Sequence, residues 1–299
     1  MSGPVRRGAA TMPEVRERVG QAGFSLGEML VAIAVLAVAT VIALSLHDAA
    51  RRSFKKGDNA AEQQQSVRIA FDRLTTDLRM AGHNVNPDGD AARPDEPIEG
   101  AFDTAIVIRS DFDADDPSAS ATPETALATG GAFATVSTGN DEIVTFVLAK
   151  PDGTSSDTLT FFADLGSPRT GAVRRVDIPR VSLAQSDPPY TLYCITLGNS
   201  DGSPVRMPLA DNVRSMGFSY HGWDGTRMAG PGGAETAGAK AARGAVRRIT
   251  VDLAGLTRDP DPGWVDAGDP DPRTRSYRKF RLAGDVAPRN FGLKGLPDL

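Results

Sequence analysis

Two acidic stretches of the chain place oxygen-bearing side chains at every second position, the spacing used by calcium-binding loops. The two sets are Asn84, Asn86, Asp88 and Asp90, and then Asp111, Asp113 and Asp115. Both are incomplete, because Pro87 interrupts the first, Asp95 replaces its expected glutamate, and Asp116 replaces the turn glycine of the second. The segment from Asp259 to Pro272 is weaker, since proline stiffens it without fixing carboxylates around one point. Solvated acidic turns are the simpler interpretation, and calcium is kept as a hypothesis.

Other chemistry-bearing residues do not assemble into a catalytic set. Gly23 to Gly27 match G-x-S-x-G, the nucleophile elbow of hydrolases, with Ser25 as the nominal nucleophile. That elbow follows a strand, whereas here a polar leader precedes the serine and an apolar run follows it. The histidines are scattered along the chain at His47, His83 and His221. We therefore expect no enzyme and no cofactor other than a calcium ion.

The composition of the 299-residue chain is that of a folded protein, with 40% hydrophobic and 24% charged residues. Its formal net charge of −5 offers no basic surface, so we expect no nucleic-acid partner. Cys194 is the only cysteine, which excludes a disulfide within one chain. Within the apolar sequence YTLYCITL, this cysteine is expected to be a buried strand residue rather than a reactive thiol.

The N-terminal region contains an apolar run with a single carboxylate, Glu28, near its start. From Phe24 to Leu46 the run has 23 residues, which span ~35 Å as a helix and suffice to cross a bilayer. A charge inside such a segment costs on the order of 2.5 to 3.5 kcal/mol, so it normally has a partner. The leader before it is modestly basic, with Arg6, Arg7, Arg16 and Arg18, which favours a cytoplasmic N-terminus.

Two simpler interpretations of this run were weighed. A secretory signal peptide could end at Ala49 and Ala50, but its apolar core is usually shorter, about 7 to 15 residues, and does not begin with a glutamate. A plain membrane anchor explains the length of the run and leaves Glu28 without a role.

Beyond the run, the sequence predicts one long helix followed by strands, which is an α+β fold. Residues 47–82 continue the helix, with an apolar stripe of Val67, Phe71, Leu74, Leu78 and Ala81 and a C-cap at Gly82. The charged residues of this segment, among them Arg73 and Asp77, are expected on its other faces. Residues 83–140 read as a loop-rich connection and 141–299 as a β-rich head, in which Ile249, Val251 and Leu253 alternate with polar residues. Segments 225–244 and 257–275 read as surface loops.

Residues 23–32, with the sequence GFSLGEMLVA, resemble the class III signal of type IV prepilins and pseudopilins. The resemblance implies a leader of residues 1–23, cleavage after Gly23 by a prepilin peptidase, N-methylation of Phe24 and a role for Glu28 in assembly. Residues 24–46 would then form the transmembrane and filament-core helix. Gly27 departs from the bulkier residue common in the family and loosens the first helical turn.

The helix end TTDLRMAGHN (75–84) and the segments 209–225, 245–256 and 277–290 resemble larger minor pilins of the PilW/PulJ type. The resemblance implies a type IV pilin-like fold and a place at or near the tip of a pilus, where the chain primes assembly. Implied partners are other minor pilins, the major pilin, the peptidase and methyltransferase, and the inner-membrane assembly platform. The precursor would cross the inner membrane once, with a periplasmic head, before reaching the cell surface.

A pseudopilin of type II secretion and, from a different class, a membrane-anchored periplasmic enzyme are the alternatives.

In the pilin interpretation, cleavage leaves a cationic amine on Phe24, and Glu28 of a neighbouring subunit neutralises it in an apolar filament core, where an unpaired charge is costly.

Overall fold

The computed structural model of the chain describes residues 24–82, 97–110, 142–151, 157–164, 173–181, 188–197 and 204–288. Gly23 and both acidic stretches with the spacing of calcium-binding loops lie outside these residues. The chain divides into two compact units, Met1–Phe54 and Lys55–Leu299. Every buried hydrophobic side chain of the described residues belongs to the second unit, so that unit has its own core.

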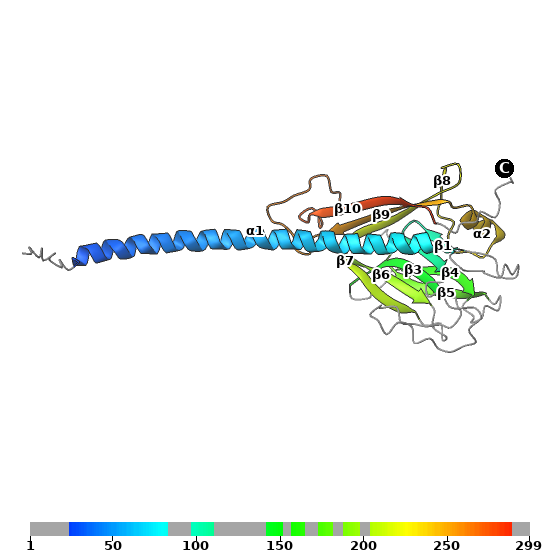
Figure 1. Cartoon of the computed structure of the whole chain (residues 1–299), viewed down its shortest axis with the longest axis horizontal. Coiled ribbons are helices and arrows are strands. Elements are labelled where there is room, and N and C mark those ends of the chain that lie inside the picture. The colour runs from blue at the N-terminus through cyan, green and yellow to red at the C-terminus, as the bar shows by residue number, and fades with distance from the viewer. Residues whose placement is uncertain are drawn as a thin grey trace, which may run out of the picture. The chain divides into compact units, whose positions relative to one another are not determined.

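The predicted long helix is present as α1 (Leu26–Met80), drawn in blue and cyan in Figure 1. It ends near the predicted cap: Gly82 has a φ of 77°, a conformation that favours glycine, and its N–H donates to the Arg109 carbonyl at 2.8 Å. The predicted apolar stripe is confirmed. Its fully buried members are Val67, Leu74, Leu78 and Ala81, and Phe71 packs at their margin.

The strands form one large antiparallel sheet and one separate two-stranded sheet. The large sheet has the order β1-β2-β3-β6-β7-β9-β10, with the short β8 paired to β7. Its strands are β1 (Ile98–Phe102), β2 (Ala105–Ser110), β3 (Glu142–Ala149), β6 (Tyr190–Leu197), β7 (Val205–His221), β8 (Arg227–Met228), β9 (Arg248–Leu256) and β10 (Lys279–Val286). The small sheet pairs β4 (Asp157–Asp164) with β5 (Val173–Arg180). An α+β fold is therefore confirmed.

The two faces of the large sheet carry separate hydrophobic clusters. On β3, Phe146 joins the cluster that holds the buried stripe of α1, while Ile143 and Val147 join the cluster of β4 and β5. Side chains of a strand point alternately to its two faces, so α1 covers one face and the β4–β5 ribbon covers part of the other. The predicted alternation on β9 is confirmed, since Ile249, Val251 and Leu253 are fully buried.

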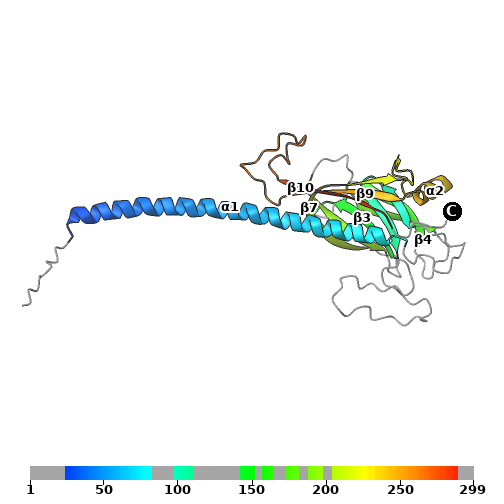
Figure 2. The ribbon, with the colours of Figure 1, turned by 45° about the horizontal axis from the view of Figure 1, so that its top comes forward.

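The second half of α1 packs against β9 and β10, which run beside it in Figure 2. At Gly255 of β9, an added Cβ would stand 2.4 Å from Val67 Cγ2. At Gly284 of β10, it would stand 3.1 Å from the Phe71 ring. Glycine at these two positions lets the strand backbone approach the helix directly.

Residues 83–140, which were predicted to be a loop-rich connection, also contribute β1 and β2 to the large sheet. Segment 225–244 was predicted to be a surface loop, yet it contains β8 and the helix α2 (Ala237–Gly244). Buried Arg243 fixes α2, because its guanidinium donates to the Ile98 carbonyl at 3.1 Å and to the Ala234 carbonyl at 2.8 Å.

Candidate functional site

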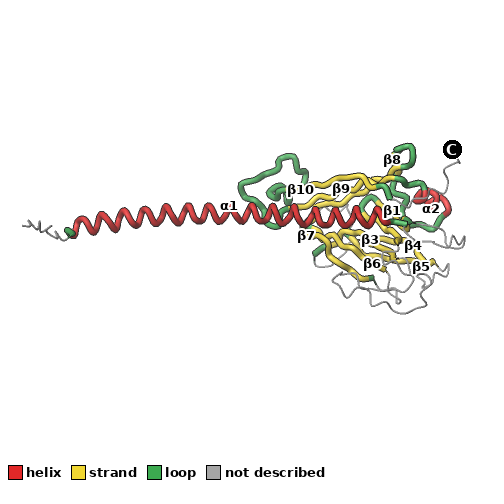
Figure 3. Tube along the Cα trace, viewed as in Figure 1, coloured by secondary structure: helices red, strands yellow, loops and turns green. Residues whose placement is uncertain are grey.

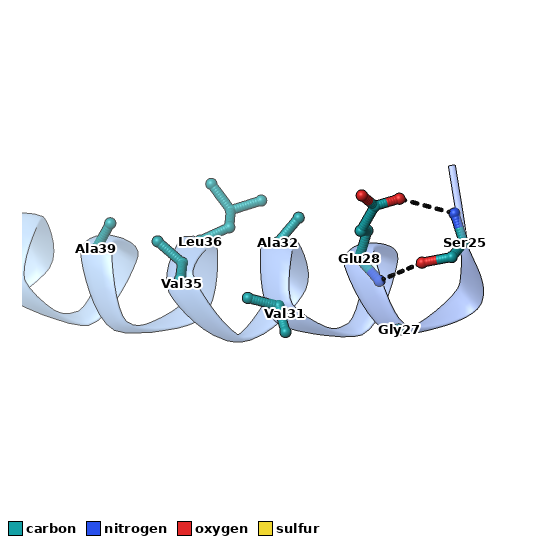
Figure 4. Close-up of a pocket in the computed structure, with 8 residues that line it drawn as sticks. All are labelled: Ser25, Gly27, Glu28, Val31, Ala32, Val35, Leu36 and Ala39. Carbon is teal, nitrogen blue, oxygen red and sulfur yellow. Dashed lines mark hydrogen bonds between the residues drawn. The ribbon is translucent and has the colours of Figure 1, made fainter. Parts of the chain in front are cut away.

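Reciprocal hydrogen bonds between Ser25 and Glu28 hold the N-terminal end of α1 (Figure 4). The Ser25 hydroxyl accepts from the Glu28 N–H at 3.2 Å, and Glu28 Oε2 accepts from the Ser25 N–H at 2.9 Å. This arrangement is a capping box, which satisfies backbone donors that a helix start leaves unpaired. Ser25 therefore acts as a helix cap, and the match to a nucleophile elbow has no structural counterpart.

The capping box gives Glu28 a partner within its own chain, which sequence analysis did not anticipate. Ser25 is the only hydrogen-bond partner of this carboxylate in the described part of the chain, and it occupies Oε2 alone. Phe24, the residue before the cap, is 85% exposed. A carboxylate has about four lone-pair sites, so Glu28 is oriented by the cap and can still accept a charged donor from another molecule.

A depression on the helix surface extends from Glu28 along the apolar run (Figure 4). Its lining is apolar apart from Ser25 and Glu28 and comprises Gly27, Val31, Ala32, Val35, Leu36 and Ala39. Gly27, Ala32 and Ala39 are small, and small residues allow another helix backbone to approach closely in an apolar medium. This surface, here called the Glu28 face, combines one carboxylate with a shape that admits a neighbouring helix.

By length and composition, α1 could cross a membrane. Its most apolar 18-residue window has a mean hydropathy of 2.8, and none of that window is buried within the protein. Large side chains of this run are more than half exposed, for example Met29 at 63% and Leu46 at 70%. Exposed apolar surface of this extent is a sign of contact with lipid or with other helices.

Cations of the protein hold the carboxylates of the Asp259 to Pro272 segment, which was the weakest of the three calcium candidates. Asp266 and Asp269 each lie 2.6 Å from Lys279 Nζ. Burial alone would raise the pKa of Asp269, but hydrogen bonds from Lys279 and Thr274 outweigh it and hold that pKa at about 2. No group of three metal-ligating side chains occurs in the described ranges.

A row of polar side chains crosses β7, β9 and β10, which sequence reasoning missed because its members are distant in the chain. Thr250 Oγ1 donates to Asp285 at 2.6 Å and lies 3.2 Å from His221 Nε2. In a hydrolase triad the carboxylate would orient the imidazole, whereas here Asp285 contacts the hydroxyl and His221 Nδ1 faces the Gly225 carbonyl at 3.4 Å. The row is cross-strand pairing on the face of the sheet opposite α1.

Asp77 is buried, contrary to its predicted place on a polar face of the helix. Only 2% of it is exposed, and its carboxylate accepts from Arg73 Nε at 2.8 Å. Burial raises the pKa of Asp77 to about 6, and the charge of Arg73 only partly opposes this rise. Cys194 is buried as predicted, and burial together with the Asp77 charge raises the pKa of its thiol to about 12.

A polar cleft of about 680 Å³ lies between the second half of α1 and strands β6 and β7. Gln63, 4% exposed, closes its floor by donating to the Asp211 carbonyl at 3.3 Å and the Asn212 carbonyl at 3.4 Å. The Asp211 carboxylate accepts from Thr191 at 2.8 Å. The two Gln63 bonds satisfy backbone carbonyls where the pairing of β6 and β7 is irregular, so the cleft is a seam between helix and sheet.

Comparisons with models of protein families, with curated proteins and with solved structures found no match to this chain.

Proposed function

We propose that the chain is a minor pilin of a type IV pilus with a type IV pilin-like fold. The observation that carries the proposal is Glu28, which a capping box holds four residues after Phe24, at the start of an apolar run whose most apolar 18-residue window is not buried within the protein. The precursor is cleaved after Gly23, and its new N-terminus, Phe24, is methylated. At or near the tip of the pilus, the chain then primes assembly.

In this mechanism, the Phe24 amine of one subunit binds the Glu28 carboxylate of its neighbour. The cap fixes the carboxylate through a neutral N–H donor, and a charge-assisted bond is roughly twice as strong as a neutral one. In an apolar filament core, the amine therefore stabilises Glu28 more than the cap does. Because the pairing occurs at one position along each helix, it sets the register between neighbouring subunits.

The remaining parts follow from this assignment. The Glu28 face packs against the helix of another minor pilin or of the major pilin. Before assembly, the apolar run spans the inner membrane, where the peptidase and methyltransferase and the assembly platform act on the precursor, and the second unit lies in the periplasm. After assembly, the chain is part of the pilus at the cell surface.

Deletion of the gene that encodes this chain tests the proposed role. We expect few or no surface filaments and normal secretion of exported proteins, with both phenotypes measured in the same strain. Complementation with the wild-type chain should restore filaments. Thr250→Ala should restore them equally well, because this variant removes the hydroxyl at the centre of the His221 row and leaves the Glu28 face intact.

Other outcomes of this experiment favour other functions. Normal filaments with defective secretion would identify a pseudopilin of type II secretion instead. If Thr250→Ala failed to complement although it folds and reaches the membrane, the periplasmic enzyme would become the better interpretation. Normal filaments and normal secretion in the deletion strain would contradict the proposal outright.

A further inference from the structure

Residues 257–278 form the loop that joins β9 to β10. It contacts the first residues of the second unit: Lys56 Nζ is 2.6 Å from Asp261 Oδ1, Lys55 Nζ is 3.6 Å from Asp259, and Asn59 donates to Asp259 at 3.2 Å. Figure 3 draws this loop in green beyond the ends of β9 and β10. The loop is therefore attached to the part of α1 that directly follows the first unit.

Internal ion pairs give the loop a defined structure and neutralise most of its acidic groups. Asp269, whose side chain is fully buried, forms ion pairs with Lys279 and Arg214. Asp261, whose side chain is 7% exposed, forms ion pairs with Lys56 and Arg278. Asp261 and Asp269 are thus buried against cations of the second unit, whereas the side chains of Asp266 and Asp259 remain 35% and 50% exposed.

The outer surface of the loop is apolar and cationic. Val265 is 70% exposed and Trp264 is 44% exposed, and the Arg278 guanidinium lies 5.5 Å from the Trp264 ring centre. The side chains of Lys55, which contacts Asp259, and of Arg273, which contacts Asp271, are 76% and 60% exposed. An exposed tryptophan and valine bordered by cations are typical of a surface that rests on anionic lipid headgroups.

The chain between the apolar run and the residues that hold the loop is short. Only eight residues, 47–54, separate Leu46 from Lys55. Even fully extended, they reach at most ~32 Å, and as helix they reach ~14 Å. If the apolar run crosses a membrane, this chain length allows the loop to reach the lipid surface.

We propose that the β9–β10 loop is a membrane-docking surface, in which Trp264 and Val265 enter the headgroup region of an anionic bilayer. This contact would fix the orientation of the second unit on the membrane before assembly. The inference requires that the apolar run spans the membrane, but it does not depend on the function as a pilin.

The second unit, residues 55–299, can be tested alone because it holds the whole buried core of the described residues. Trp223, 78% exposed, is the only other tryptophan and follows the end of β7 that pairs with the start of β9. The Trp264 loop follows the other end of β9, a strand of about 26 Å. With Trp223→Phe, the fluorescence reports Trp264 alone.

We expect vesicles of phosphatidylcholine with phosphatidylglycerol to shift the Trp264 emission to the blue, and vesicles of phosphatidylcholine alone to bind weakly. Trp264→Ser should lower vesicle binding about tenfold, since it removes the apolar area that would be buried. The matched variant Trp223→Ser should bind as wild type does. Thermal unfolding of each variant identifies any that fails to fold, and Val265→Ser then provides an independent test of the same surface.

The proposal is overturned if folded Trp264→Ser and Val265→Ser variants bind anionic vesicles as tightly as wild type, or if no variant binds. It is also overturned if the Trp264 emission shifts with protein concentration in the absence of lipid, because the loop would then be a contact between copies of the chain.

Discussion

In cells whose only copy carries Glu28→Gln, we expect the chain to be cleaved and to accumulate in the inner membrane, with few or no surface filaments. Glutamine at this position still accepts a hydrogen bond from the Ser25 N–H, so the capping box remains. The negative charge is lost, so the Phe24 amine of a neighbour meets no counter-ion in the filament core, where an unpaired charge is costly. Fractionation and counting of surface filaments measure both effects.

Two further variants separate the role of the charge from that of the cap. Glu28→Val removes both and should insert at least as well as wild type, because it deletes a charge that costs ~2.5 kcal/mol or more in an apolar helix, yet it should not assemble. Ser25→Ala removes the hydroxyl of the cap, at a cost of ~1 kcal/mol, but keeps the carboxylate and should assemble almost normally. Normal filaments with Glu28→Gln and few with Ser25→Ala would show that Glu28 is only a cap residue.

The second large effect is expected at Asp77, where the stability of residues 55–299 should depend on pH through one carboxyl. Its folded pKa of about 6 lies above the ordinary 3.8, so folding favours the protonated form. The stabilisation is complete below pH 3.8, falls as the pH rises toward 6 and is lost above it. The difference of about two pKa units corresponds to on the order of 3 kcal/mol.

Asp77→Asn should abolish this dependence and be more stable than wild type at neutral pH. Asparagine imitates the protonated acid, and Arg73 can turn toward solvent since a third of its side chain is exposed. Urea unfolding of both proteins from acid to neutral pH measures the difference, and Asp72→Asn on the exposed side of the same helix is the matched control for loss of a charge. If the free energy of unfolding depended on pH in the same way for wild type and Asp77→Asn, Asp77 would not be the responsible carboxyl.

The sequence was sufficient for the elements with strong periodicity. The apolar stripe of α1 and the alternation along β9 each repeat at one unambiguous period, so their buried faces were predicted correctly. The burial of Asp77 was not predicted, because a charged residue four positions from Arg73 on a helix normally lies on a solvated face. Its burial depends on packing against the sheet, which periodicity does not report.

The missed elements are short or depend on distant contacts. α2 lies in a glycine-rich segment, and buried Arg243 stabilises it by reaching the Ile98 carbonyl, 145 residues away in the chain. β1 has five residues and β8 has two, too few to show a period. For such elements, tertiary contacts override local propensity.

At the candidate site, the sequence identified Phe24 and Glu28 but not the cap between them. The signal was present, because Ser25 and Glu28 have the S-x-x-E spacing of a capping box directly before an apolar run. The ion pairs of the β9–β10 loop had no such signal, since Lys56, Arg214 and Lys279 reach its carboxylates from three different elements.

The N-terminus of the protein recovered from membranes tests the central claim most directly. Mass spectrometry of the N-terminal peptide should find a chain that begins at Phe24 and carries one methyl group on its amine. In a strain without prepilin peptidase, the same peptide should retain residues 1–23. Cleavage after Ala50, an uncut N-terminus in the wild-type strain, or cleavage that persists without the peptidase would contradict the assignment as a pilin.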